Sequence, residues 1–408
     1  MKNRPSLLLI LLLWVSAVSA QQSEWIGTWG ASPLPPSAAN GPFPGSPTFM
    51  NQTVRQIVRI SAGGDRVRLR LSNEYGSRPL VVGAARIAIV DDKGAIKAGT
   101  ERAVTFGGKP SVTIPSGAPF VSDAIDLAVQ PLASLSISLY FPEDTGPCTC
   151  HATGMQTAYV SMPGDFTSGA FEPAQTIQSR AFLSGVEVAT RGPAHVVVVL
   201  GDSISDGVGS TVNENRRWPD NLAARLVERR GRGAWGVVNE GISGNRVLSD
   251  GAGESALTRF DRDVLAVPGA THVVVFEGVN DIGIAFGARR PGFNLPAGPE
   301  LTADSMIMGY RQIIARAHEH GLKVYGATIA PYEGAAYYSD KGEAVRSAVN
   351  DWIRKGGEFD GVIDFDAVLR DPNHPTQIEA SLHAGDHLHG SDAGYRKMAD
   401  AIDLDLFR

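Results

Sequence analysis

The stretch HVVVVLGDSIS at residues 195–205 decides the fold of the second half of the chain. Its first six residues form an almost unbroken apolar run, which is typical of a parallel strand buried on both faces. Four more short apolar runs follow, at residues 237–239, 272–276, 324–329 and 362–365. Stretches with helical periodicity separate these runs. We therefore predict a three-layer α/β/α domain with a five-stranded parallel sheet over residues 191–408.

Two of the predicted helices have clear boundaries. One spans about Thr302 to His320, with Thr302 as its N-terminal cap and Gly321 directly after its last turn. The other lies near residues 220–230 and presents one apolar face. Amphipathic helices of this kind are expected to cover the faces of the parallel sheet.

The first half of the chain, from about residue 25 to 188, has the pattern of strands and turns. Arg66, Arg68 and Arg70 alternate with apolar residues, which predicts a strand with one cationic and one apolar face. Other short apolar runs, at residues 80–82, 112–114 and 135–140, are separated by Gly and Pro. We predict an antiparallel, jelly-roll-like β-sandwich over residues 21–190. The cationic face should point outward or toward the other domain, because burying unpaired guanidinium groups costs too much free energy.

The N-terminus has the features of a secretory signal peptide over residues 1–20. Two positive residues, Lys2 and Arg4, precede an apolar run at residues 7–15. Val18-Ser19-Ala20 then provides the small residues of a cleavage site. A buried N-terminal helix is the alternative, but so short and uniform an apolar run favours a signal peptide, with cleavage after Ala20. We therefore expect a secreted or periplasmic protein without stable membrane insertion, because the run is shorter than a membrane-spanning helix.

Charge and cysteine content restrict the partners only weakly. The formal net charge is −6 and no long basic run is present, so a nucleic-acid partner is not predicted. Cys148 and Cys150 are the only cysteines and are separated by one residue. Export would allow them to oxidise, whereas the small ring that results would be strained, so a disulfide and two free thiols remain alternatives.

Residues whose side chains or N–H groups could take part in catalysis follow the predicted strands. They lie at the edge of the sheet where sites form in parallel α/β folds. Ser203 comes directly after the first strand, on a sharp turn into a helix that would expose its hydroxyl. Gly244 follows the second strand and Asn280 the third, while Asp386 stands three residues before His389. Alone, each has an ordinary interpretation as a helix cap, a glycine turn or a solvated histidine. Together they bring a hydroxyl, hydrogen-bond donors and an Asp/His pair to neighbouring strand ends.

In this order and spacing the residues resemble the four blocks of the SGNH hydrolases, within the GDSL esterase/lipase superfamily. The resemblance covers about residues 196–406. It implies that Ser203 is the nucleophile, His389 the general base and Asp386 the residue that orients the imidazole. The N–H groups of Ser203 and Gly244 and the amide of Asn280 are implied to form the oxyanion hole. The family chemistry implies no metal and no organic cofactor.

The first half of the chain and Gly390 lie outside what the resemblance explains. The first half, with the sequence WIGTW at residues 25–29, looks like the β-domain that precedes the catalytic domain in some bacterial members, but no role for it is implied. Gly390 replaces the proline that family members often have after the histidine.

A metal site is the alternative interpretation of the C-terminal residues. His383, Asp386, His387 and His389 are all potential ligands. The hydrolase interpretation also gives roles to Ser203, Gly244 and Asn280, which a metal site leaves unused. We therefore favour it, with His383 and His387 as solvated or hydrogen-bonded neighbours.

The sequence predicts a secreted serine esterase for small-molecule or carbohydrate esters. Two loops could shape its pocket: residues 286–299, and residues 331–342 with Tyr332, Tyr337 and Tyr338. Aromatic rings at a cleft rim suit sugars or aryl groups. Deacetylation of carbohydrates is the leading prediction; a general aryl or short-chain esterase and a lysophospholipase are alternatives. A non-catalytic carbohydrate-binding protein is the alternative of another class.

Overall fold

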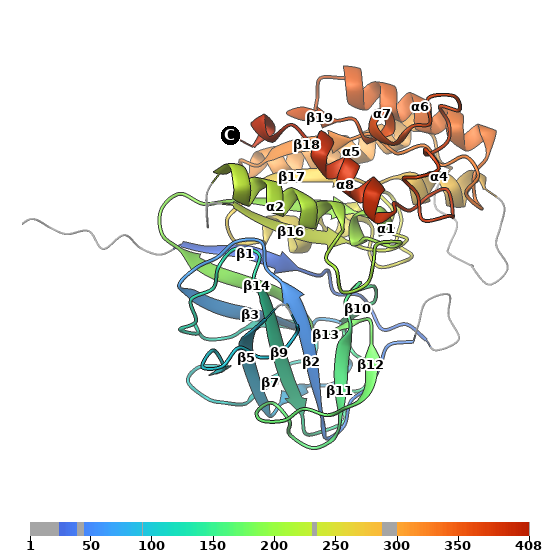
Figure 1. Ribbon diagram of the computed structural model, residues 1–408. Coiled ribbons are helices and arrows are strands. Elements are labelled where there is room, and N and C mark those ends of the chain that lie inside the picture. The colour runs from blue at the N-terminus through green and yellow to red at the C-terminus, as the bar shows by residue number, and fades with distance from the viewer. Residues whose placement is uncertain (1–23, 39–44, 92, 231–234, 288–299, 408) are drawn as a thin grey trace, which may run out of the picture.

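The computed structural model of the protein describes residues 24–38, 45–91, 93–230, 235–287 and 300–407 (Figure 1). The predicted signal peptide lies outside these ranges. No helix in the described ranges is both long and apolar enough to cross a membrane.

The second half of the chain contains the predicted five-stranded parallel sheet, in the order β16-β15-β17-β18-β19. Its strands are β15 (His195–Gly201), β16 (Trp235–Gly241), β17 (Ala270–Phe276), β18 (Lys323–Ala327) and β19 (Gly361–Ile363). Residues 196–200 of β15 are fully buried. This burial explains their continuous apolar character, because both faces of the strand are covered.

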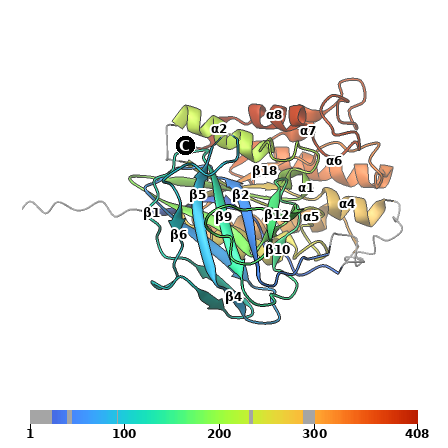
Figure 2. The same cartoon turned by 60° about the horizontal axis from the view of Figure 1, so that its bottom comes forward.

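Helices cover both faces of this sheet. They are α1 (Ser203–Asp206), α2 (Trp218–Arg230), α3 (Ala256–Phe260) with the short π-helix η1 (Asp261–Leu265), α4 (Val279–Phe286), α5 (Ala303–Glu319), α6 (Asp340–Lys355), α7 (Phe365–Leu369) and α8 (Asp392–Ala401), followed by the 3₁₀ helix η2 (Leu404–Leu406). Figure 2 shows α2 and α8 on one side of the sheet and α4 and α5 on the other. The predicted α/β/α fold is therefore confirmed.

Helix caps fix where two of the predicted elements begin or end. Thr302 caps α5, and its side chain accepts a hydrogen bond from the Ser305 N–H, as expected for a helix that starts there. By contrast, the apolar run at residues 362–365 was predicted as one strand, and this is wrong at its end. Asp364 caps a new helix through the Ala367 N–H, so Phe365 begins α7.

The first half of the chain is rich in antiparallel strands. One sheet has the order β1-β14-β3-β8 and the other the order β12-β11-β2-β9-β5-β6. The strands of the first are β1 (Glu24–Gly30), β14 (Leu183–Thr190), β3 (Arg66–Asn73) and β8 (Ala118–Val121); those of the second are β12 (Pro173–Ile177), β11 (Ala158–Pro163), β2 (Gln52–Arg59), β9 (Ser134–Phe141), β5 (Ala84–Val90) and β6 (Arg102–Ala103). Two small pairs complete this region: β10 (Cys150–His151) with β13 (Arg180–Ala181), and β4 (Leu80–Val82) with β7 (Val112–Ile114). Cys148 and Cys150 form a disulfide, which decides between the two alternatives that the sequence left open.

The arginines of β3 lie as predicted, on the face of the strand away from the apolar core. Arg68 and Arg70 both pair with the carboxylate of Glu187 on β14. The guanidinium of Arg68 also lies 4.3 Å from the centre of the Trp25 ring. These partners offset the cost of partial burial, because each charged group keeps a close opposite charge or an aromatic face.

The β-rich region packs against β16, the edge strand of the parallel sheet, through β1. A side chain at Gly236 would place its Cβ 2.3 Å from the Gly27 carbonyl oxygen, so glycine is required for this close approach. The Val237 N–H donates to the Ser61 hydroxyl across the same contact, at 2.8 Å. The predicted domain border falls between β14 and β15, and the division of the chain into two domains stays a prediction.

Candidate active site

Ser203 lies at the start of α1, immediately beyond the carboxyl end of the central strand β15. The side chain of Asp202 caps this short helix by accepting a hydrogen bond from the Ile204 N–H at 2.9 Å. Ser203 is 6% exposed, and its hydroxyl lies 2.8 Å from Nε2 of His389. The turn therefore presents the hydroxyl to the imidazole, but the predicted exposure of Ser203 is wrong, because the residue is buried.

His389 and Asp386 come from the loop before α8. Nδ1 of His389 lies 2.5 Å from Oδ2 of Asp386, and the other carboxylate oxygen accepts the N–H groups of Leu388 and His389. Partial burial would raise the pKa of Asp386, but these bonds and the charge of His389 outweigh burial. The pKa of Asp386 therefore lies well below its usual range. An ionised Asp386 accepts the Nδ1 hydrogen, which leaves Nε2 as the acceptor for the Ser203 hydroxyl.

The other two predicted residues, Gly244 and Asn280, lie in and beside a turn that follows β16. Gly244 is part of this turn and has a φ of 82°, in the left-handed region that favours glycine. Asn280 lies in the first turn of α4, after β17, and its Nδ2 donates to the Asn245 carbonyl oxygen at 3.0 Å. Its Oδ1 accepts a hydrogen bond from the Tyr337 hydroxyl at 3.2 Å. The structure thus brings Asn280 next to the glycine turn, and one Nδ2 hydrogen is already in use.

The predicted tyrosine rim differs from the structure. Tyr332 is fully buried and packs against the rings of Tyr337 and Tyr338, so it does not line a cleft. Residues 340–342, which we assigned to the loop, form the start of α6. Of the other predicted loop, residues 288–299 lie outside the described ranges.

The remaining C-terminal histidines contact each other and the backbone. Nδ1 of His383 accepts the N–H groups of Gly385 and His387, and the His383 and His387 rings lie 4.4 Å apart. In the described part of the chain, no three His, Cys, Asp or Glu side chains are grouped as metal ligands. Gly390 departs from the family pattern for a steric reason, because a Cβ there would lie 2.8 Å from the Tyr395 ring.

A buried charge network lies beneath the site, and the sequence did not reveal it. Arg259 of α3 is fully buried and pairs with Asp263 and Glu277 at 3.0 and 3.3 Å. It also donates to the carbonyl oxygen of Gly201, two residues before Ser203, and to Oδ1 of Asn245. A single arginine on a five-residue helix carries no local sequence signal for such a role.

Burial changes the pKa values of the carboxyl groups around this network. It raises the pKa of Asp202 to about 7 and that of Asp281 to about 6. The Asp281 carboxylate accepts the N–H groups of Val247 and Leu248, which anchors the chain beyond the glycine turn. Perturbed carboxyl groups at a strand edge are frequent at functional sites, although structural networks show them too.

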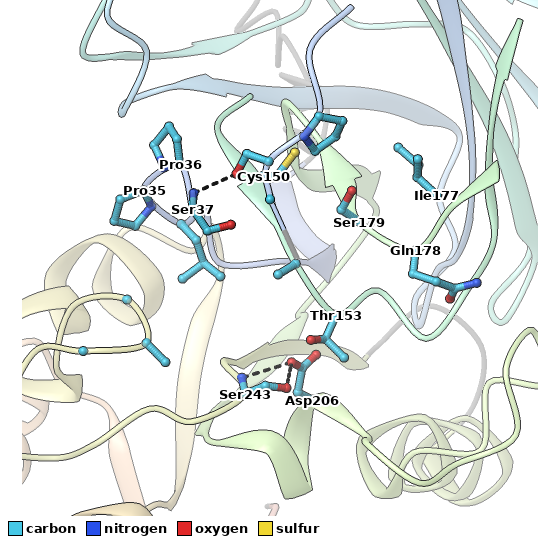
Figure 3. A pocket seen from close by; sticks show the side chains of 18 residues that line it. Pro35, Pro36, Ser37, Cys150, Thr153, Ile177, Gln178, Ser179, Asp206 and Ser243 are labelled. Atoms are coloured by element: carbon cyan, nitrogen blue, oxygen red, sulfur yellow. Dashed lines mark hydrogen bonds between the residues drawn. The ribbon is translucent and has the colours of Figure 1, made fainter. Parts of the chain in front are cut away.

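A cavity of about 470 Å³ lies beside the site, between the β-rich region and the α/β half (Figure 3). Its walls are largely apolar and come from residues 34–37, 45–47, 150, 152–153 and 177–179 of the first half and residues 251–253 of the second. Asp206 and Ser243 also line it, each close in sequence to a predicted oxyanion donor. The sequence could not show this cavity, because segments distant in the chain form it.

The chain was compared with known proteins. Residues 199–397 match the model of the GDSL-like lipase/acylhydrolase family. This part of the chain, which contains the parallel sheet and the site, belongs to that family. No curated protein matches the chain.

Several solved structures resemble about half of the chain. One is a putative lipolytic protein of the G-D-S-L family from Desulfitobacterium hafniense, with 22% identity, a TM-score of 0.37 and coverage of 50% of this chain and 96% of that one. An acetyl xylan esterase from Geobacillus stearothermophilus has 22% identity, a TM-score of 0.41 and coverage of 53% and 95%. The esterase EstA from Pseudoalteromonas sp. has 17% identity, a TM-score of 0.36 and coverage of 50% and 93%.

Proposed function

We propose that the protein is an exported serine esterase that hydrolyses short-chain acyl esters. The observation that carries the proposal is the position of the His389 ring, which lies 2.8 Å from the Ser203 hydroxyl and 2.5 Å from the Asp386 carboxylate. This is the arrangement that a serine nucleophile, its general base and an orienting carboxylate require. It also favours an enzyme over a non-catalytic carbohydrate-binding protein. Export rests on the signal peptide predicted from the sequence.

In the proposed reaction, Nε2 of His389 takes the proton of the Ser203 hydroxyl as its oxygen attacks the ester carbonyl. Asp386 holds the imidazole in place and stabilises the imidazolium that forms. The imidazolium then gives its proton to the alcohol as it departs. The acyl group stays bound to the Ser203 oxygen. Water, activated by the same histidine, hydrolyses this acyl-enzyme and regenerates the free serine.

The oxyanion of each tetrahedral intermediate needs donors that are already in place. We assign this role to the N–H groups of Ser203 and Gly244 and to the amide of Asn280. In the described part of the chain, neither backbone N–H has an acceptor, so both are available to a substrate oxygen. Donors fixed in advance stabilise the developing charge without reorganisation, which is the main source of rate enhancement in such sites.

For the substrate, we propose neutral esters with a small acyl group, with acetylated carbohydrates as the leading class. Among the described residues that line the cavity of Figure 3, Asp206 is the only charged one and it already has partners, which supports a neutral ligand. These described residues include no cation for a phosphate group, which disfavours a lysophospholipid. The largely apolar walls favour aryl esters as a second candidate.

The acyl-chain dependence of kcat/KM tests the proposed substrate class. We expect a maximum between acetate and butyrate in a series of p-nitrophenyl esters. Each further methylene gains about 0.8 kcal/mol only where apolar surface buries it, and we assign the largely apolar cavity of Figure 3 to the alcohol part of the ester. A maximum at octanoate or longer would contradict the proposal and would assign the cavity of Figure 3 to the acyl chain. A parallel series of acetylated sugars and aryl acetates separates the two candidates for the alcohol part.

The pH dependence of kcat/KM tests the general base. We expect kcat/KM to fall as the pH is lowered, because protonated His389 cannot accept the serine proton. The pKa of Asp386 is well below its usual range, so the loss of its carboxylate does not cause this fall. A flat profile for p-nitrophenyl acetate, with acylation shown to be rate-limiting, would be incompatible with a histidine base.

A further inference from the structure

A buried ion pair joins the β-rich region to the helix that begins with Ser203. Nε2 of His151, on β10, lies 2.9 Å from Oδ1 of Asp206, the last residue of α1. The side chains of His151 and Asp206 are only 6% and 4% exposed. Residues three apart on a helix lie one turn from each other, so this pair is close to the nucleophile.

The hydrogen bonds of the ring indicate that His151 is charged. Its Nδ1 lies 3.0 Å from the Ser32 carbonyl oxygen, which can only accept, so Nδ1 carries a hydrogen. Its Nε2 faces a carboxylate and carries the second. Burial lowers the pKa of His151, but the charge of Asp206 and these two bonds outweigh burial and raise it, against an opposing effect of Arg180.

The second oxygen of Asp206 holds the glycine turn. Oδ2 accepts the Ser243 N–H at 3.1 Å and the Ser243 hydroxyl at 2.6 Å. Ser243 directly precedes Gly244, to which we assigned an oxyanion donor. Figure 3 shows Asp206 and Ser243 joined in this way at one end of the cavity. One carboxylate thus links the helix of Ser203, the turn of Gly244 and an imidazolium from the other half of the chain.

We propose that His151 is a positioning residue for the oxyanion hole. Its ring fixes the Asp206 carboxylate, and the carboxylate in turn fixes Ser243 and the Gly244 N–H. This inference rests on the proposed function, because the Gly244 N–H has a catalytic role only if an oxyanion forms. It gives the β-rich region a part in catalysis that involves no contact with the substrate.

Loss of the ring would act on the transition state more than on substrate binding. Without His151, the buried Asp206 carboxylate lacks its cationic partner, and its hold on Ser243 weakens as it protonates or reorients. A displaced oxyanion donor lowers kcat and leaves KM nearly unchanged, because the charge it stabilises is absent from the bound substrate. A purely structural role would instead lower stability and the amount of folded enzyme.

The test compares His151→Ala, His151→Gln and Ser61→Ala with the wild type. Ser61 is the matched control, since it also bonds across the contact between the two halves but at Val237, near the start of β16. We measure kcat and KM for p-nitrophenyl acetate, with functional enzyme counted by complete titration with a p-nitrophenyl alkylphosphonate. Complete loss of one oxyanion donor costs about 10²–10³ in rate, so we expect His151→Ala to lower kcat by roughly tenfold or more. His151→Gln retains one N–H donor and should recover part of this loss, while Ser61→Ala keeps the wild-type kcat.

Wild-type kcat in His151→Ala, or an equal loss in Ser61→Ala, would overturn the inference. If His151→Ala does not fold, His151→Gln and Ser243→Ala decide. Both should lower kcat, and their double variant should lose less than the product of the single effects, because they act through one carboxylate. If the double variant instead loses the full product of the two single effects on kcat, the two residues do not act through the same carboxylate. A wild-type protein that does not hydrolyse p-nitrophenyl acetate would instead refute the proposed function, which keeps the two failures distinct.

Discussion

Replacing Ser203 by alanine should lower kcat for p-nitrophenyl acetate by about 10⁴-fold or more, since nucleophile and base act as one unit. The hydroxyl is the group that forms the acyl-enzyme, and it lies 2.8 Å from Nε2 of His389. The loss should appear in kcat, while the thermal midpoint stays close to that of the wild type.

His389→Ala should produce a loss of similar size, and the double variant should be hardly worse than either single one. His383→Ala is the matched control, because this nearby histidine bonds to backbone N–H groups and has no part in the proposed reaction. Substantial turnover by Ser203→Ala, in protein expressed without wild-type contamination, would refute the mechanism.

The second large effect concerns stability. Replacing Arg259 by methionine should lower the free energy of unfolding by about 3–5 kcal/mol, because it takes a cationic partner away from two buried carboxyl groups. Arg259 is fully buried between Asp263 and Glu277. Burial would raise the pKa of Asp263, but its bonds to Arg262 and Arg259 lower it, so this carboxylate is ionised and depends on them.

Urea unfolding measures this effect, with Arg311→Met as the control. Arg311 forms an exposed pair with Glu358, and such pairs contribute about 0–1 kcal/mol. A loss of less than about 1 kcal/mol in Arg259→Met would show that the buried network is not what holds these elements together. Because Arg259 also bonds to Gly201 and Asn245, the variant should lose activity as well.

Those parts of the fold that depend on local patterns could be predicted from the sequence. The run at residues 196–200 is apolar on both strand faces because helices cover both, and the alternation at residues 66–71 reflects a strand with one buried face. The error at Phe365 has a simple cause. The apolar run continues from β19 into α7, and the helix start depends on the cap formed by Asp364.

The residues that the family resemblance assigned to the site lie together in the structure, because each follows a strand or sits in the C-terminal loop. The residues that support them could not be predicted. His151 lies on a strand of two residues, and its partner Asp206 is 55 positions away. Tyr332 illustrates the opposite error: its ring suggested a rim, yet it is buried. Contacts between distant segments leave no periodic signal in the sequence.

The most direct test of the central claim is covalent labelling of the nucleophile. The protein is incubated with a p-nitrophenyl alkylphosphonate, which mimics the tetrahedral intermediate, and the site of labelling is located by peptide mass spectrometry. We predict one label per chain, on Ser203, with p-nitrophenol release and loss of esterase activity in equal proportion. Esterase activity that survives complete labelling of Ser203, or that is lost through a label on another residue, would contradict the account.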